Sequence, residues 1–336
     1  MQESAFAAGP PRRNLSLDEV RALVASDLER LDRVIVERLT SDVALVNQVA
    51  RYIVAGGGKR LRPLLVILAA RACGYRGDTH VEAAAIIEFI HTATLLHDDV
   101  VDGSELRRGR DTANSVFGNE ASVLVGDFLY SRSFQMMVGI GEVRIMGVMA
   151  DATNDIAEGE VLQLMNCHDP DTDERRYFDV IRCKTARLFE SGARIAAIIA
   201  GADRVLEDAL AEFGLRLGTA FQLIDDALDY SASSEQMGKN AGDDLAEGKP
   251  TLPLIYALRH SSPRERETIR SAISHGGLDE LDTVLGAIVS TGALDYTARL
   301  AREQADAAVD ALAALPDSTW RDALASVARI AVERTG

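Results

Sequence analysis

The 336-residue sequence predicts an all-α fold, a single-domain helical bundle, and three observations support this prediction. Alanine and leucine are abundant while aromatic residues make up only 5% of the chain, a mixture that favours helices over sheets. Apolar residues recur with a helical period almost everywhere, and the alternation typical of strands is nearly absent. No shift in composition or linker separates two regions. We therefore expect one domain over residues 17–336, with a flexible tail over residues 1–16.

Start and stop signals predict the individual helices. Ser16 and Ser41 are placed to cap the first two, the glycines at 56–58 end the second, and Pro63 lies in the first turn of the third. The expected helical ranges are, approximately and in order, 16–39, 41–55, 63 onward, 79–102, 119–139, 142–166, 174–200 and 203–231. A glycine-containing loop over 233–249 and further amphipathic helices from residue 250 complete the chain.

The charge and the apolar stretches limit the possible partners. A net charge of −16 argues against a nucleic-acid partner, because binding a polyanion requires clustered Lys and Arg. Residues 1–16 contain no apolar targeting segment. The longest apolar stretches, at 61–72 and 83–96, are interrupted by charged or polar residues and are too short to span a bilayer. Cys73, Cys167 and Cys183 follow no CxxC pattern and are expected to be buried thiols, so we expect a cytoplasmic protein.

Two aspartate clusters of equal spacing provide the main indication of function. They end two apolar helical runs, LLHDDVVD and FQLIDDALDY, and comprise Asp98, Asp99 and Asp102, and Asp225, Asp226 and Asp229. The first and last aspartates of each cluster lie on one helix face, roughly 6 Å apart along the axis. Carboxylates this close raise each other's pKa unless a cation separates them. Such oxygen ligands suit Mg²⁺ that is shared with a substrate phosphate.

Cations flanked by glycines accompany the clusters. Lys59 and Arg62 lie in GGGKRLRP beside a helix start, where unpaired N–H groups favour a phosphate. Arg107 and Arg108 are adjacent in a turn and therefore point in different directions, so each could hold one anion. Further positive charge near the second cluster comes from Lys184, Lys239 and Lys249. The sequence thus predicts two diphosphate pockets beside the acidic pairs.

These motifs resemble those of the trans-isoprenyl diphosphate synthase family over roughly residues 17–334, and the similarity is greatest to its long-chain bacterial members. The matching segments are GGGKRLRP, EFIHTATLLHDDVVDGSELRRG, VLVGDFLY, EGEVLQL, KTARLFE, GTAFQLIDDALDY and GDDLAEGKPTLPL, in the family's order. The resemblance implies a helical bundle of the isoprenoid synthase type with a central apolar cavity. It also implies a homodimer and a Mg²⁺ cofactor bound on the diphosphate of an allylic substrate.

The resemblance also implies the roles of individual residues. Asp98, Asp102, Asp225 and Asp229 would bind the metal, with Asp99 and Asp226 supporting them. Isopentenyl diphosphate would contact Lys59, Arg62, His91 and Arg108. The allylic diphosphate would contact Arg107, Lys184, Lys239 and Lys249. Thr185 and Gln222 would present oxygens to the reacting carbons, and Lys184 would act with them in catalysis.

The implied reaction is repeated condensation of isopentenyl diphosphate onto an allylic diphosphate such as farnesyl diphosphate. Ala93 and Thr94, just before Asp98, are small and leave room for a long product. The resemblance implies that this product is all-trans octaprenyl diphosphate for a quinone side chain. Met137 and Met149 could close the tunnel floor. The residues themselves do not determine whether the product is octaprenyl or nonaprenyl diphosphate.

Other functional classes also fit the sequence. A terpene cyclase or other ionising lyase would also use an acidic metal site, but it would need only one diphosphate pocket. A non-catalytic partner of an active synthase could lose aspartates, whereas this chain keeps all six. Among single residues, His91 and the two methionines could be ordinary core side chains, and Lys59 and Arg62 ordinary surface cations. The sequence does not separate catalytic support from packing for five other polar residues, Arg110, Asp127, Glu158, Asp243 and Asp244.

Overall fold

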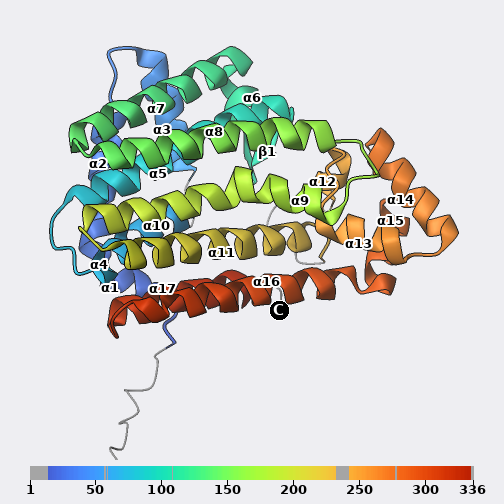
Figure 1. The fold of residues 1–336 in the computed structure, drawn as a ribbon. Helices are drawn as coiled ribbons and strands as arrows, with labels where there is room; N and C mark the ends of the chain where they lie inside the picture. Colours follow the sequence, from blue (N-terminus) through green and yellow to red (C-terminus); the bar gives the residue numbers. More distant parts are fainter. Residues whose placement is uncertain are drawn as a thin grey trace, which may run out of the picture.

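The structure is a computed structural model that describes residues 14–56, 58, 60–107, 109–231, 242–276 and 278–333. Long helices run side by side along the body of the molecule, and the shorter helices α12 to α15 gather at one end (Figure 1). Within the described ranges the only sheet is one two-stranded hairpin. The all-α prediction is confirmed.

The N-terminal helices largely follow the predicted signals. Ser16 caps the first through a capping box with Glu19, as its sequence suggests. The predicted helix to residue 39 is, however, broken at Val24, and Ser41 does not cap the next helix, which begins three residues later behind Val43. The bounds are α1 Leu17–Leu23, α2 Ala25–Leu39, α3 Ala44–Ala55, α4 Leu61–Ala72 and α5 Thr79–Val101.

The segment after α5 contains short elements that the periodicity did not predict. A hairpin pairs Leu106 with Asp111 and Arg107 with Arg110. Its strands are too short for an alternating pattern to be visible in sequence. Two long helices then follow close to their expected ranges. The bounds are β1 Leu106–Arg107, β2 Arg110–Asp111, α6 Ala113–Phe117, α7 Asn119–Ile140 and α8 Val143–Asn166.

The next helical run differs from the prediction in one way that matters for the site. The expected helix over 174–200 contains a π-helical turn, η1 (Arg182–Ala186), between α9 (Glu174–Ile181) and α10 (Arg187–Ile199). Such turns recur at functional sites because they displace the side chains of one turn from the regular helical register. Beyond it, Asp203 caps α11 (Arg204–Asp229), which ends at the second aspartate cluster.

The C-terminal part returns to helices, as expected. Within the predicted loop over 233–249 the structure adds one short helix, α12. The bounds are α12 Asp243–Ala246, α13 Leu252–His260, α14 Pro263–His275, α15 Leu281–Thr291, α16 Ala293–Ala311, the 3₁₀ turn η3 Leu312–Ala314 and α17 Thr319–Val332.

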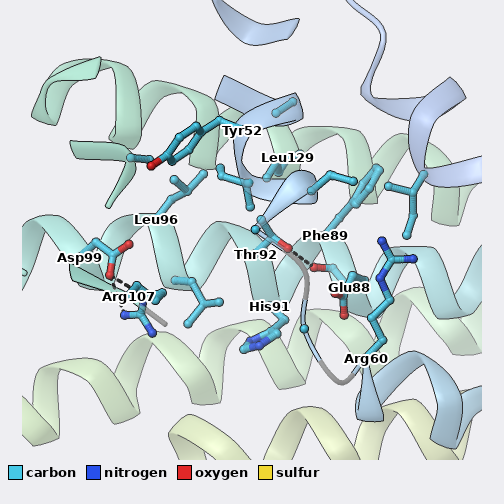
Figure 2. Close-up of a pocket in the computed structure, with 18 of the residues that line it drawn as sticks. Tyr52, Arg60, Glu88, Phe89, His91, Thr92, Leu96, Asp99, Arg107 and Leu129 are labelled. Carbon is cyan, nitrogen blue, oxygen red and sulfur yellow. Dashed lines mark hydrogen bonds and ion pairs between the residues drawn. The ribbon is translucent and has the colours of Figure 1, made fainter. Parts of the chain in front are cut away.

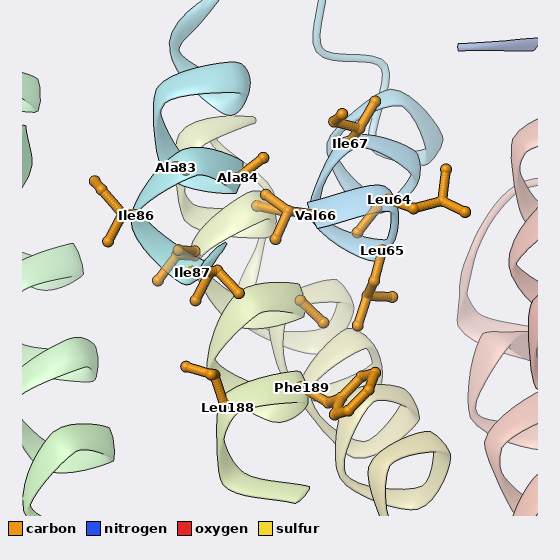
Figure 3. Close-up of a cluster of buried hydrophobic side chains, with 14 of the residues drawn as sticks. Leu64, Leu65, Val66, Ile67, Ala83, Ala84, Ile86, Ile87, Leu188 and Phe189 are labelled. Carbon is orange, nitrogen blue, oxygen red and sulfur yellow. The ribbon is translucent and has the colours of Figure 1, made fainter. Parts of the chain in front are cut away.

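The core lies between α4, α5 and α10. In Figure 3, Val66 of α4 points toward α5, which carries Ile87, and Leu188 and Phe189 lie on the adjacent α10. All four are almost completely buried. Because α4 and α5 are apolar around most of their circumference, both must be covered on several sides, which a bundle provides. This packing fixes the end of α5, where the first aspartate cluster lies.

Two glycines of α11 allow this helix to approach α10 closely. A Cβ at Gly214 would lie 2.5 Å from the Phe189 carbonyl oxygen, and one at Gly218 would lie 2.6 Å from the Ala186 Cα. No side chain fits at such distances, so glycine permits the two backbones to touch. This contact brings Gln222, one helical turn further along α11, next to the π-helical turn.

Two broader expectations can be compared with the structure. Among the described helices, none combines the length and the hydropathy required to cross a bilayer. Cys73, Cys167 and Cys183 are free thiols, as expected, but they are half-buried rather than fully buried. Burial raises the pKa of the Cys73 thiol to about 11.

Candidate active site

The two aspartate clusters, more than 120 residues apart in sequence, line one cavity of ≈ 420 Å³. The first cluster lies at the C-terminal end of α5 and the second at the C-terminal end of α11. Asp98 and Asp102 contribute from one side, and Asp225 and Asp229 from the other. The sequence predicted the pairing within each cluster, and the tertiary structure brings the two clusters together.

The middle aspartate of each cluster is held by protein groups. Asp99 is only 4% exposed and forms an ion pair with Arg107, whose Nε and Nη2 lie 2.7 and 2.6 Å from its Oδ1. Asp98 lines this cavity and Asp99 does not, as the one-face argument predicts. Asp226 is equally buried but does line the cavity, and it accepts hydrogen bonds from Tyr177 and Gln222. Asp229 accepts the Asp244 N–H at 3.2 Å.

Two lysines contact the first cluster. Lys184 Nζ lies 3.3 Å from Asp98 Oδ2 and 2.6 Å from Glu160 Oε2. Lys249 Nζ lies 2.8 Å from Asp102 Oδ2 and 2.5 Å from Glu247 Oε2. Burial alone would lower the pKa of both lysines, but the carboxylates around them outweigh burial and raise it. Both lysines therefore carry a positive charge inside the cavity.

The charge of the cavity tests whether a divalent cation fits. Nine described carboxylates line it against four Lys and Arg side chains. Burial, followed by the charge of Asp244, raises the pKa of Asp226 to about 8, and burial with the charge of Asp98 raises the pKa of Glu160 to about 7. Burial is the larger cause of both shifts, and the neighbouring carboxylates add to it. Carboxylate oxygens gathered in this way suit Mg²⁺ or Ca²⁺. The residues that line the larger cavity therefore fit a divalent cation.

No three acidic, His or Cys side chains in the described ranges lie close enough together to form a ready-made metal cage. The acidic pairs instead face each other across open space. That arrangement suits ions that take part of their coordination from a substrate phosphate, as Mg²⁺ commonly does.

A second, smaller cavity of ≈ 170 Å³ lies on the other side of α5 and is mainly apolar (Figure 2). Arg62 and His91 line both cavities, and their side chains meet at 3.0 Å between Nη1 and Nε2. The Arg62 guanidinium also lies over the Phe189 ring, 4.5 Å from its centroid. Arg62 is thus a cation fixed between the cavities, which excludes the interpretation that it is an ordinary surface cation.

The π-helical turn places Lys184 and Thr185 in the larger cavity. Close packing supports it, because a Cβ on Gly159 of α8 would lie 2.8 Å from the Lys184 backbone nitrogen. Thr185 Oγ1 donates to Gln222 Oε1 at 2.9 Å. Thr185 of the π-helical turn and Gln222 of α11 therefore meet at the wall of the larger cavity.

Several predicted residues lie elsewhere. Lys59, Arg108 and Lys239 fall outside the described residues. Thr94 lines the larger cavity. Ala93, Met137 and Met149 are completely buried in the main core, and neither cavity described above is lined by any of them.

The structure also separates the polar residues that the sequence left unassigned. Asp243 and Asp244 line the larger cavity, and Arg110 lines the smaller one, 5.0 Å above the Tyr52 ring. Asp127 and Glu158 line neither cavity; they contact His97 and Asn154 respectively.

Some cavity residues were missed in the sequence. Glu160, Gln163 and Asn166 of α8 all line the cavity. Their i, i+3, i+6 spacing on one helix was a signal that could have identified them. Tyr177 was also missed, and here the sequence carried no signal, since only the fold brings it to Asp226.

Comparison with known proteins gives a consistent result. Residues 43–288 match the polyprenyl synthetase family. The chain is 56% identical to octaprenyl diphosphate synthase of Escherichia coli K12, an alignment that covers 95% of this chain and 99% of that protein. It is 47% identical to the all-trans-nonaprenyl-diphosphate synthase (geranyl-diphosphate specific) of Rhodobacter capsulatus, with 94% and 97% covered.

A solved structure agrees over nearly the whole chain. The polyprenyl synthase of Caulobacter crescentus, crystallised with calcium and isoprenyl diphosphate, superposes with a TM-score of 0.92 at 47% identity. The match covers 97% of this chain and 100% of that one.

Proposed function

Since this chain belongs to the polyprenyl synthetase family, we propose that it condenses isopentenyl diphosphate repeatedly onto an allylic diphosphate and releases octaprenyl diphosphate. One observation carries the proposal: aspartates of both clusters line the same cavity as Lys184 and Lys249. Acidic pairs on opposite walls, with lysines between them, suit a metal-bound diphosphate. The octaprenyl product is favoured by the 56% identity to the Escherichia coli enzyme.

We assign the metal to Asp98 and Asp102 of the first cluster and to Asp225 and Asp229 of the second. Mg²⁺ bound there would neutralise the charge that the departing diphosphate gains, and the calcium in the Caulobacter crescentus structure supports a divalent ion. Asp99 and Asp226 orient neighbouring groups, because each is already held by hydrogen bonds within the protein.

The cations divide between the two diphosphates. Lys184 and Lys249, beside Asp98 and Asp102, would hold the allylic diphosphate and stabilise its negative charge as the C–O bond breaks. Arg62 and His91, fixed against each other between the two cavities, would hold isopentenyl diphosphate. From the resemblance, Lys59 and Arg108 join the second set, while Arg107 and Lys239 join the first.

The chain's own groups then account for the remaining steps. Thr185 and Gln222 direct oxygen atoms at the allylic carbon, where positive charge develops. The double bond of isopentenyl diphosphate attacks that carbon, and a proton passes to the departing diphosphate. The apolar side chains Leu95 and Phe221 border both cavities and exclude water, which would quench the cation.

We also propose a homodimer formed through α7 and α8. Exposed apolar side chains gather on these two packed helices, among them Leu124 at 66%, Val143 at 76% and Leu164 at 62% exposed. On α8, one face carries Val143, Val161, Leu164 and Met165. Val161 follows Val143 by 18 residues, which make five full turns, and Leu164 and Met165 lie about one turn beyond Val161. An apolar face on two adjacent helices suits a second copy of the same chain. Leu164→Glu should convert a dimer to a monomer in light scattering, whereas Val289→Glu, at an isolated exposed valine, should not.

We propose that the enzyme works in the cytoplasm and that its product supplies a quinone side chain. The three free thiols support a reducing compartment. One domain with an N-terminal tail is the organisation that we propose for the whole chain.

An assay of the purified protein with farnesyl diphosphate, radiolabelled isopentenyl diphosphate and Mg²⁺ tests the proposed reaction. Label should enter a long lipid whose mass is that of octaprenyl diphosphate, and chelation of the metal should abolish its formation. Release of diphosphate without incorporation of label would indicate an ionising lyase. No turnover of either substrate would indicate a non-catalytic subunit.

A further inference from the structure

A chain of three hydrogen bonds runs from a buried tyrosine to the cavity wall. Tyr177 of α9 donates its hydroxyl to Asp226 Oδ2 at 2.5 Å. Gln222 Nε2 donates to Asp226 Oδ1 at 2.7 Å, and Thr185 Oγ1 donates to Gln222 Oε1 at 2.9 Å. The chain connects α9, α11 and the π-helical turn.

The three hydrogen bonds run in one direction, because both oxygens of Asp226 accept. Gln222 turns its NH₂ group toward Asp226 and its carbonyl oxygen toward Thr185. A carbonyl oxygen also only accepts, so Thr185 must give its single hydroxyl hydrogen to Gln222. The Thr185 oxygen is then left with lone pairs and without a hydrogen for the cavity that it lines.

We propose that Tyr177 is a positioning residue whose hydroxyl holds the Asp226 carboxyl group against the Gln222 NH₂ group and thereby keeps the Thr185 oxygen turned toward the allylic cation as an acceptor. The inference rests on the proposed function, since it concerns the cation formed in that reaction. Tyr177 supplies one of the two side-chain donors that hold Asp226 in place. Without it, the Asp226 carboxyl group can rotate away from Gln222. The Gln222 amide then loses the contact that sets its orientation and can turn over, and the Thr185 hydroxyl can point its hydrogen at the developing positive charge.

The competing explanation is that Tyr177 is simply a core tyrosine with a satisfied hydroxyl. The two explanations predict different kinetics. A structural role would lower thermal stability and affect substrate binding and turnover together. A positioning role would lower the rate of the ionisation step, and hence kcat, while the KM values for both diphosphates remain nearly unchanged, because neither diphosphate contact involves this chain.

Tyr177→Phe tests the proposal, since it removes only the hydroxyl. We expect kcat to fall roughly 10- to 100-fold, with both KM values within about twofold of wild type. Tyr296→Phe is the matched control. Tyr296 of α16 donates its hydroxyl to the carboxylate of Glu174 on α9, at 3.1 Å from Oε2, so this variant also removes a hydrogen bond from a tyrosine to a carboxylate. Tyr296 does not line the cavity. This control should keep wild-type kinetics.

A double-mutant cycle links the effect to Thr185. If Tyr177 acts through Thr185, then adding Tyr177→Phe to the Thr185→Val variant should not lower kcat further. Full additivity of the two losses, or a wild-type kcat in Tyr177→Phe, would overturn the proposal. If Tyr177→Phe did not fold, Asp226→Asn, which keeps the shape but offers one acceptor fewer, must show the same loss in kcat. Failure of the wild-type protein to elongate any substrate would contradict the proposed function instead, so the two failures are distinct.

Discussion

Lys249 Nζ lies 2.8 Å from Asp102 Oδ2 and joins parts of the chain that are 147 residues apart. Asp102 ends the first aspartate cluster, and Lys249 follows the second cluster by twenty residues. Lys184 contacts Asp98 in the same way at 3.3 Å, so each outer aspartate of the first cluster has its own lysine. Two separate segments of the chain, the π-helical turn and the residues after α12, therefore each place a lysine at the first cluster.

Loss of the Lys249 charge should weaken turnover strongly. We expect Lys249→Met to lower kcat/KM for the allylic diphosphate about 100- to 1000-fold, because a buried electrostatic contact to the leaving group is lost. Arg270→Met provides a control, since it also breaks an ion pair, with Asp171, but at the surface. A loss below about threefold in steady-state assays of Lys249→Met would contradict the assignment.

The aspartates of the first cluster should differ in what their loss affects. Asp98→Asn should lower kcat about 100-fold or more with little change in thermal stability, because Asp98 lines the cavity. Asp99→Asn should mainly lower stability, because Asp99 is buried in an ion pair with Arg107. Parallel measurement of kcat and the melting temperature would check this difference. Equal losses of kcat in the two variants would refute the one-face argument.

Product length provides a test of the tunnel floor. Met137 and Met149 are completely buried, so Met137→Ala and Met149→Ala should each open space and shift the product toward longer chains. Each should also cost about 2–5 kcal/mol of stability, the usual range for such truncations. Mass analysis of the products measures the shift. An unchanged product distribution in both variants would remove the two residues from this role.

A histidine far from the cavity should make stability depend on pH. His80 is completely buried beside Arg71 and Asp27, and burial, followed by the charge of Arg71, lowers its pKa below 6.5. Between its folded pKa and 6.5 the unfolded chain binds more protons, so stability rises with pH in this window and is lost as the pH falls through it.

His80→Phe should remove that dependence while keeping a ring against Tyr75, whose centroid lies 5.5 Å away. We therefore expect the urea midpoint of the wild type to fall more between pH 7.5 and 5.5 than that of the variant. The same decrease in both proteins would show that other groups are responsible.

Much of the fold could be predicted because its signals are local. The capping box at Ser16 and the helical period of α5, α7 and α8 depend on residues a few positions apart. The interruption at Val24, the hairpin after α5 and the π-helical turn were missed. Each departs from a regular period for only a few residues, and neighbouring helices decide whether such a departure is stable.

For the site, the sequence by itself determined which groups are available: paired aspartates one helical turn apart, small residues before Asp98, and cations beside glycines. These follow from spacing along a single helix or loop. Only the tertiary structure decided which of these groups meet. Gly214 and Gly218 let α11 touch α10, so that Gln222 reaches Thr185, and the packing of α9 brings Tyr177 to Asp226. Contacts of this kind depend on backbone approach between distant segments, and no local spacing in the chain encodes that distance.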